Sequence, residues 1–243
     1  MSAASDNLGA KPGQRILYGR RSARRLRTQR RQAVERALPG LRIALPPGED
    51  AIDPAAWFDG TRSGFWLEVG FGAGEHLLEQ ARFRPDAGFV GCEPFLDGVA
   101  KLVQALDADR IGNVRIFMDD ARLLLRRLPA SCLAGVFVLF SDPWPKKRHH
   151  KRRFVDTPAL DLLARSMAPG AELRIATDDR GYLVWILEHM QRADEFDWLA
   201  RRPEDWCRRP PDWPATRYER KAIAAGRECI YLRYRRRDPG RET

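Results

Sequence analysis

Asp142 stands just beyond the apolar run Leu133–Phe140 and opens the segment Pro143-Trp144-Pro145. A continuous apolar run bounded by turn residues predicts a buried parallel strand, and ligands of open α/β sheets bind beyond the carboxyl ends of such strands. Asp142 is therefore the candidate catalytic residue.

A cationic run follows Pro145. Its basic members are Lys146, Lys147, Arg148, His149, His150, Lys151, Arg152 and Arg153. Clustered Lys and Arg side chains bind polyanions by releasing counterions from phosphates, so the run favours a nucleic acid over a small metabolite. The alternative interpretation is a solvated charged loop, which the position at the end of a predicted strand makes less favoured.

A glycine-rich turn joins the predicted strand Phe65–Val69 to a predicted helix. It reads Glu68-Val69-Gly70-Phe71-Gly72-Ala73-Gly74. Glycine lets a ligand approach the backbone closely, and a helix N-terminus offers unpaired N–H groups. A dinucleotide site needs G-x-G-x-x-G, but the third position here is Glu75, whose carboxylate would repel a pyrophosphate. The acid two residues before Gly70 suits the cationic end of S-adenosylmethionine instead.

Two further acids follow predicted strands. Glu93 closes the second strand, where a carboxylate accepts hydrogen bonds from ribose hydroxyls. Asp120 follows the third strand, where an acceptor can meet the adenine amine. The predicted cofactor residues are thus Glu68, Gly70, Gly72, Gly74, Glu93 and Asp120. The alternative is an ordinary strand-to-helix turn in which the acids cap helices.

Predicted strands and helices alternate along the chain. The expected strands are 65–69, 88–93, 113–118, 133–140 and 171–177, and the expected helices are 75–82, 95–106, 121–128, 158–167 and 182–191. This alternation predicts an α/β fold with a mostly parallel sheet and helices on both faces. Two later runs, 196–199 and 229–233, predict a terminal hairpin that adds an antiparallel edge strand, which makes seven strands.

The chain has 243 residues, of which 44% are hydrophobic, so one substantial core is expected. The formal net charge of +10 indicates a nucleic-acid or anionic-surface partner. Residues 1–45 form an Arg-rich, flexible arm in this interpretation, and residues 46–243 form the globular domain. A transit peptide is less favoured because the arm is poor in serine and its arginines come in pairs.

The four cysteines, Cys92, Cys132, Cys207 and Cys229, form no C-x-x-C pair, and the histidines show no ligand spacing. We therefore expect neither a metal site nor a disulfide framework. No apolar segment is long enough for a membrane helix, and residues 1–14 lack the apolar core of a secretory signal. A soluble, cytoplasmic protein is expected.

The chain resembles the bacterial tRNA (guanine-N7-)-methyltransferase family over residues 60–235. Four stretches carry the resemblance: 67–74 (LEVGFGAG), 140–153 (FSDPWPKKRHHKRR), 176–178 (ATD) and 216–219 (TRYE). The resemblance implies a Rossmann-like class I methyltransferase that uses S-adenosylmethionine, has tRNA as its partner and acts as a monomer or homodimer. The expected product is N7-methylguanosine at guanosine 46 in the variable loop.

The resemblance also implies roles for residues. Asp142 joins Glu68, Glu93 and Asp120 as a cofactor-site acid and is the catalytic residue. The implied substrate-binding residues are Lys146, Arg148, His149, His150, Lys151, Arg152, Arg153, Asp178, Thr216, Arg217, Tyr218 and Glu219. By itself, Thr216-x-x-Glu219 is a helix capping box, and the resemblance favours a substrate role over that structural one.

The chemistry of the residues agrees with N7 methylation. Guanine N7 carries a lone pair and no proton, so no general base is needed, and the product is cationic. A carboxylate such as Asp142 can bind the N1–H and amino edge of the base and stabilise the developing charge, a role that Asp178 or Glu219 could share. Trp144 either stacks on the base or anchors the loop by packing.

Two other functions remain open from the residues. Asp142-Pro143-Trp144 partly matches the D-P-P-[FYW] loop of enzymes that methylate exocyclic amines of RNA or DNA. The second is a non-catalytic RNA-binding protein on a degenerate methyltransferase fold, which would explain the arginines. It would not explain why the cofactor-site acids Glu68, Glu93 and Asp120 are intact.

Overall fold

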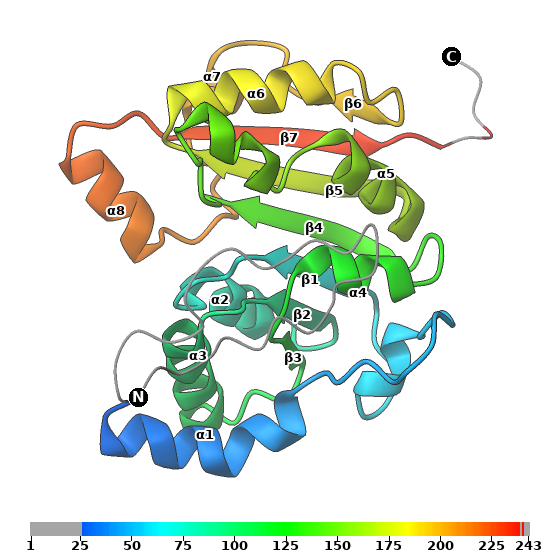
Figure 1. Cartoon of the computed structure of the whole chain (residues 1–243), viewed down its shortest axis with the longest axis vertical. Helices are drawn as coiled ribbons and strands as arrows, with labels where there is room; N and C mark the ends of the chain where they lie inside the picture. Colours follow the sequence, from blue (N-terminus) through cyan, green and yellow to red (C-terminus); the bar gives the residue numbers. More distant parts are fainter. Residues whose placement is uncertain (1–25, 239, 241–243) are drawn as a thin grey trace, which may run out of the picture.

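The computed structural model describes residues 26–238 and 240. Its centre is a seven-stranded sheet in the order β3-β2-β1-β4-β5-β7-β6 (Figure 1). The strands are β1 (Phe65–Val69), β2 (Gly88–Cys92), β3 (Val114–Phe117), β4 (Leu133–Leu139), β5 (Met167–Thr177), β6 (Phe196–Trp198) and β7 (Ile230–Arg236). Strands β1 to β5 pair in parallel, whereas β7 runs antiparallel to both β5 and β6.

The strand order reverses between β1 and β4, which are neighbours in the sheet. Strands β2 and β3 extend from β1 in one direction, and β4 and β5 extend in the other. Ligands of such sheets bind in the crevice beyond the carboxyl ends at this reversal. The glycine turn follows β1 and the Asp142 loop follows β4, so both border the crevice.

Helices cover both faces of the sheet. They are α1 (Thr28–Leu41), α2 (Glu75–Phe83), α3 (Leu96–Ala108), α4 (Ala121–Arg127), α5 (Thr157–Ser166), α6 (Arg180–Met190), α7 (Glu204–Cys207) and α8 (Arg217–Ala224). On one face Leu77 of α2 packs in a cluster with Phe89. On the other face Leu124 of α4 and Ile186 of α6 pack in a cluster with Val138. The fully buried strands therefore have apolar side chains on both faces, as parallel sheets require.

Side-chain caps begin four of these helices, namely α4, α5, α6 and, through Thr216, α8. Asp120 accepts a hydrogen bond from the Arg122 backbone N–H, and Asp156 and Asp179 cap α5 and α6 in the same way. These bonds satisfy N–H groups that have no partner inside the helix. Two short 3-10 helices, Pro54–Trp57 and Lys147–Arg152, complete the elements.

This architecture confirms the predicted α/β, Rossmann-like fold. Two details differ from the sequence prediction. Strand β5 begins already at Met167, where the apolar pattern predicts the end of a helix. The antiparallel strand β7 lies one position inside the sheet, because the short β6 pairs with its outer side. Among the described residues, no helix is both long and apolar enough to cross a membrane.

The N-terminal region is only partly described. Residues Thr28–Leu41 form α1, which packs against α3 and pairs Arg36 with Asp107. Residues 1–25, which carry much of the predicted basic arm, lie outside the described residues. The division into an arm of residues 1–45 and a domain of residues 46–243 stays a prediction.

Candidate active site

The glycine turn after β1 leaves open space beside its backbone. Gly70 and Gly72 have φ values of +70° and +56°, and a Cβ atom at either would meet no heavy atom within 4 Å. Such positive φ values favour glycine, and a side chain would occupy the free space. Gly74 differs, because a Cβ there would lie 2.7 Å from the Leu102 side chain. Gly74 thus allows α2 and α3 to pack closely.

Helix α3 holds this turn through a glycine that the sequence pattern does not single out. A Cβ at Gly98 would lie 2.1 Å from the carbonyl oxygen of Gly72. The turn is also held by Glu93, whose carboxylate accepts hydrogen bonds from the backbone N–H groups of Gly72, at 2.9 Å, and Phe95, at 3.0 Å. Burial raises the pKa of Glu93, although these two hydrogen bonds oppose the shift.

A buried pair lies beneath the turn. The Nδ1 atom of His76 is 2.7 Å from a carboxylate oxygen of Glu68, and the two residues are 2% and 3% exposed. The ring of His76 also meets the Phe137 ring edge-on, with centroids 4.6 Å apart. Within the described part of the chain, His76 Nε2 has no hydrogen-bond partner. The pair thus keeps the Glu68 carboxylate fixed at the base of the site.

These elements enclose a cavity of about 340 Å³, which we call the glycine-turn cavity. Its walls come from the glycine turn, from the end of β4 and from α8. They include Glu68, Gly70, Gly72, Glu75, His76, Lys101, Phe140, Thr216, Arg217 and Tyr218. The backbone N–H of Arg217 donates a hydrogen bond to Glu75, so the start of α8 is fastened to the start of α2 across the cavity.

The cavity fits the predicted cofactor. It combines a buried carboxylate, two glycines with unobstructed backbone and an unpartnered ring nitrogen of His76. Anionic and acceptor groups of this kind suit a cationic amino-acid end. Asp120, in contrast, caps α4 and pairs with Arg122 at 3.2 Å, and Gly74, Glu93, Asp120 and Asp142 do not line this cavity. Their cofactor contacts stay predictions.

The loop after β4 has an unusual backbone. Phe140 and Trp144 adopt positive φ values of 52° and 45°, which are strained for aromatic residues. Between them Asp142 is exposed to solvent. Burial is the main cause of the raised pKa of Glu93, and the negative charge of Asp142 adds to it. The same charge contributes, after burial and Asp178, to the raised pKa of Tyr218.

Helix α6 anchors both ends of this loop. The hydroxyl of Tyr182 is 3.2 Å from Ser141 Oγ and accepts a hydrogen bond from the Val155 backbone N–H at 3.3 Å. Trp185 Nε1 donates to the Val155 carbonyl at 2.6 Å. Tyr182 is completely buried, so the loop is tied to the core on both sides of Asp142.

Most of the basic run lies at the surface. Lys146, Lys147, Arg148 and Lys151 are exposed, and the guanidinium of Arg152 lies 4.9 Å from the centre of the Trp144 ring. Arg153 is different, because it is 3% exposed and its Nε donates to the Pro143 carbonyl at 2.8 Å. The exposed basic residues therefore present charges that an RNA could reach. Arg153 instead supports the loop from inside the protein.

The predicted substrate residues after β5 and in α8 also meet. The Tyr218 hydroxyl is 3.3 Å from an oxygen of Asp178, which also pairs with Arg227 at 2.8 Å. Glu219 is 2% exposed and forms the capping box with Thr216.

Glu219 has two further partners. It accepts a hydrogen bond from the Tyr231 hydroxyl and pairs with Arg209 at 3.1 Å. The Thr216–Glu219 motif therefore acts as a helix cap. If Glu219 also bound the substrate, its carboxylate would have to do so while it contacts Thr216, Tyr231 and Arg209. Among the described residues, no three His, Cys, Asp or Glu side chains are grouped so that they could hold a metal ion.

Comparisons with known proteins agree with this arrangement. Residues 63–232 match a family model described as "Putative methyltransferase". The chain is 45% identical over 229 residues to the tRNA (guanine-N(7)-)-methyltransferase of Rhodospirillum rubrum, which covers 92% of this chain and 90% of that protein. It is 48% identical over 219 residues to the protein of the same name from Azorhizobium caulinodans, with 90% and 94% covered. The chain belongs to the tRNA (guanine-N7-)-methyltransferase family.

A solved structure shows the same fold. It is a variant of the 16S rRNA (adenine(1408)-N(1))-methyltransferase from Catenulisporales acidiphilia, described with its cosubstrate SAM. The two chains are 16% identical, with a TM-score of 0.50 over 75% of this chain and 90% of that one. At this identity the likeness is evidence for the fold alone.

The sequence analysis misses three supporting residues of this family member: His76, Gly98 and Tyr182. Each acts through a contact between distant segments, which periodicity cannot reveal. A histidine within a helix and close to a predicted cofactor acid is the one local signal that points to His76.

Proposed function

We propose that the protein transfers the methyl group of S-adenosylmethionine to N7 of guanosine 46 in the variable loop of tRNA. The observation that carries this proposal is that Asp142 follows β4 and the glycine turn follows β1, and these two strands are parallel neighbours in the sheet, so both lie at the same edge. A base bound beside Asp142 would lie at the mouth of the glycine-turn cavity, where a methyl donor would be held.

The cofactor supplies an electrophilic methyl group on a sulfonium. In the proposal, Glu68 and the open backbone at Gly70 and Gly72 hold its amino-acid end, and Glu93 receives the ribose. Methyl transfer is an in-line displacement, so the protein contributes by holding the nucleophile close and by excluding water. Helix α8, fastened to Glu75 over the cavity, provides that cover.

Asp142 acts on the base in this proposal. Its carboxylate accepts hydrogen bonds from the Watson–Crick edge of guanine and stabilises the positive charge that develops as N7 is methylated. The exposed residues Lys146, Lys147, Arg148 and Lys151 bind phosphates of the tRNA. Support for an RNA substrate also comes from the net charge of +10 and from the names of the relatives.

The test is to incubate the protein with unmodified tRNA and S-adenosylmethionine labelled in the methyl group. We expect labelled N7-methylguanosine after digestion, and chain cleavage specific for this nucleoside should map it to position 46. The control is a tRNA in which adenosine replaces guanosine 46, which should not be labelled. A label on an exocyclic amino group, or on the control tRNA, would overturn the proposal.

A further inference from the structure

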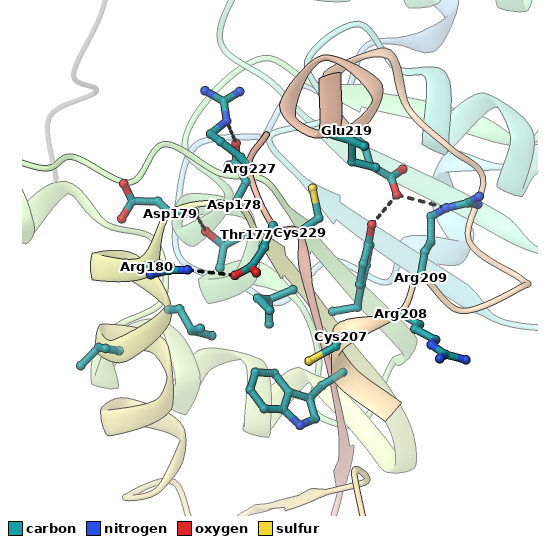
Figure 2. A pocket seen from close by; sticks show the side chains of 17 residues that line it. Thr177, Asp178, Asp179, Arg180, Cys207, Arg208, Arg209, Glu219, Arg227 and Cys229 are labelled. Atoms are coloured by element: carbon teal, nitrogen blue, oxygen red, sulfur yellow. Dashed lines mark hydrogen bonds and ion pairs between the residues drawn. The ribbon is translucent and has the colours of Figure 1, made fainter. Parts of the chain in front are cut away.

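A larger cavity, of about 750 Å³, lies farther along the same edge of the sheet, beyond β5 and at the start of β7 (Figure 2). We call it the Trp206 cavity. A hydrogen bond links the walls of the two cavities. Asp178, which lines the Trp206 cavity, accepts it from the hydroxyl of Tyr218, which lines the glycine-turn cavity. Its volume is in the range of sites that bind drug-sized ligands or nucleotides.

One side of this cavity is apolar and accessible. Leu183 and Val184 of α6, Trp206 of α7 and Ile223 of α8 contribute to it. Val184 is 55% and Ile223 is 56% exposed, so the two side chains form an exposed apolar part of this wall. A ring that entered here would find a stacking partner in Trp206, which is only partly buried.

The rim carries charges that are largely neutralised. Arg227 pairs with Asp178 at 2.8 Å, Arg209 with Glu219 at 3.1 Å and Arg180 with Glu228 at 3.1 Å. Figure 2 shows the pairs of Arg227 with Asp178 and of Arg209 with Glu219, and Arg208 lies apart from them. Within the described residues, the Arg208 side chain has no hydrogen-bond or ion-pair partner, and it is exposed.

Arginines also line a hollow outside the cavity. Arg208 and Arg209 border this neighbouring hollow of about 480 Å³, together with Arg202 and Arg233. Three of these four, Arg202, Arg209 and Arg233, pair with carboxylates. An accessible apolar wall next to Arg208, which is exposed and unpaired among the described residues, is complementary to a nucleotide whose base is unstacked and whose phosphate lies at the rim.

We infer that the Trp206 cavity receives an unpaired nucleotide of the tRNA that is next to the methylated guanosine, with its base beside Trp206 and its phosphate at Arg208. This inference rests on the proposed function. The target guanine occupies the space near Asp142, and the chain of the tRNA runs from there past Asp178 into the cavity. The site thus grips two successive unstacked nucleotides.

The test combines a cavity-filling variant with an altered RNA. Val184→Trp places a large ring in the cavity from an exposed helix position, so the fold should not suffer. The RNAs are the tRNA itself and two versions in which the nucleotide before or after the target lacks its base. For the wild-type protein, one abasic version should bind roughly 5- to 150-fold more weakly, the effect of losing one stacked base.

In Val184→Trp that same abasic change should have little further effect, since the base is already excluded. Arg208→Ala should weaken tRNA binding and reduce its salt dependence, whereas Arg235→Ala, an exposed arginine outside both hollows, serves as the matched control. Cofactor affinity, measured by calorimetry, should be unchanged in all three variants.

Equal losses for the abasic RNAs in wild type and Val184→Trp would overturn the inference. Wild-type tRNA affinity of Val184→Trp combined with loss of methylation would also overturn it, because the cavity would then take the target base itself. Neither result depends on where the methyl group is placed, so product analysis of the wild-type protein tests the proposed function separately.

Discussion

The Nδ1 atom of His76 lies 2.7 Å from the Glu68 carboxylate, and both side chains are almost completely buried. This contact fixes the orientation of the imidazole ring against the carboxylate and directs Nε2 away from it. The pair links the floor of the glycine-turn cavity to the core at Phe137.

Replacing His76 should therefore cost stability. His76→Phe leaves the buried Glu68 carboxylate without this partner and should lower the free energy of unfolding by about 1–3 kcal/mol. The double variant His76→Phe with Glu68→Leu should lose less than the sum of the two single changes, because both polar partners are then removed together. Urea denaturation of the four proteins measures this, and strictly additive losses would show that the pair is not coupled.

Substitutions at the glycines of the turn should have different effects, on cofactor binding at Gly72 and on stability at Gly74. Gly72→Val should abolish cofactor binding because the new side chain enters the open space, and the positive φ at this position should add a loss of stability without unfolding the domain. Gly74→Ala should instead reduce stability, since its Cβ would collide with Leu102. Gly112→Val, at another unobstructed glycine without positive φ, is the control. Calorimetry and thermal unfolding distinguish these outcomes, and unchanged cofactor affinity of Gly72→Val would remove the turn from the site.

Glu93 should make stability depend on pH. Burial raises its pKa in the folded protein above the ordinary value of 4.5, so the folded state holds the proton more tightly than the unfolded state. The contribution of Glu93 to the free energy of unfolding is fully present below pH 4.5, and it is lost as the pH rises through the raised pKa. The wild-type protein should therefore lose stability relative to Glu93→Gln across that window. Thermal unfolding at several pH values tests this, and a constant difference would contradict it.

Asp142 should act mainly on the methyl-transfer step. Asp142→Ala should slow single-turnover transfer by about 10²–10³-fold, the range for loss of one preorganised electrostatic partner. Asp142→Asn should fall between Ala and wild type, because it keeps some hydrogen bonding to the base but loses the charge. Wild-type rates for both variants, at saturating tRNA and cofactor, would make Asp142 structural and leave Asp178 or Glu219 as the stabilising group.

Tyr182 should influence the same step from a distance. Tyr182→Phe removes the contact with Ser141 Oγ and leaves the Val155 N–H unpaired, at a cost of about 1–3 kcal/mol in stability. Because the Asp142 loop is then less well held, single-turnover transfer should slow while cofactor affinity is unchanged. Tyr234→Phe, another buried tyrosine that is remote from the loop, provides the comparison. Equal rates in the two variants would assign Tyr182 to stability alone.

The sequence predicts the turn between β1 and α2 well because its signals are local. The spacing of Gly70 and Gly72 after an apolar run is sufficient to place a turn at the end of a buried strand, and the structure has β1 at Phe65–Val69. Asp120 shows the limit of such reasoning. An acid after a strand suits both a ligand contact and a helix cap, and the structure shows the cap.

Composition does not show which members of the basic run are buried and which are exposed, because the residues that bury them are far away in the chain. Arg153 stacks over Tyr182 and Trp185 of α6, with distances of 5.3 and 5.0 Å to the ring centres. Its neighbours Lys151 and Arg148 are exposed. Charge alone treats all of these residues alike.

The anchoring of the Asp142 loop at both ends separates its exposed charges from the groups that hold it. Tyr182 contacts Ser141 and Val155 through the same buried hydroxyl, and Arg153 adds a hydrogen bond to Pro143 from within the loop, so the exposed stretch between them is held at both ends. Changes in the length or charge of the stretch beyond Asp142 would alter which RNA is gripped without displacing the frame that aligns the reacting groups. The exposed stretch of the loop could therefore change while the residues that hold its ends stay the same.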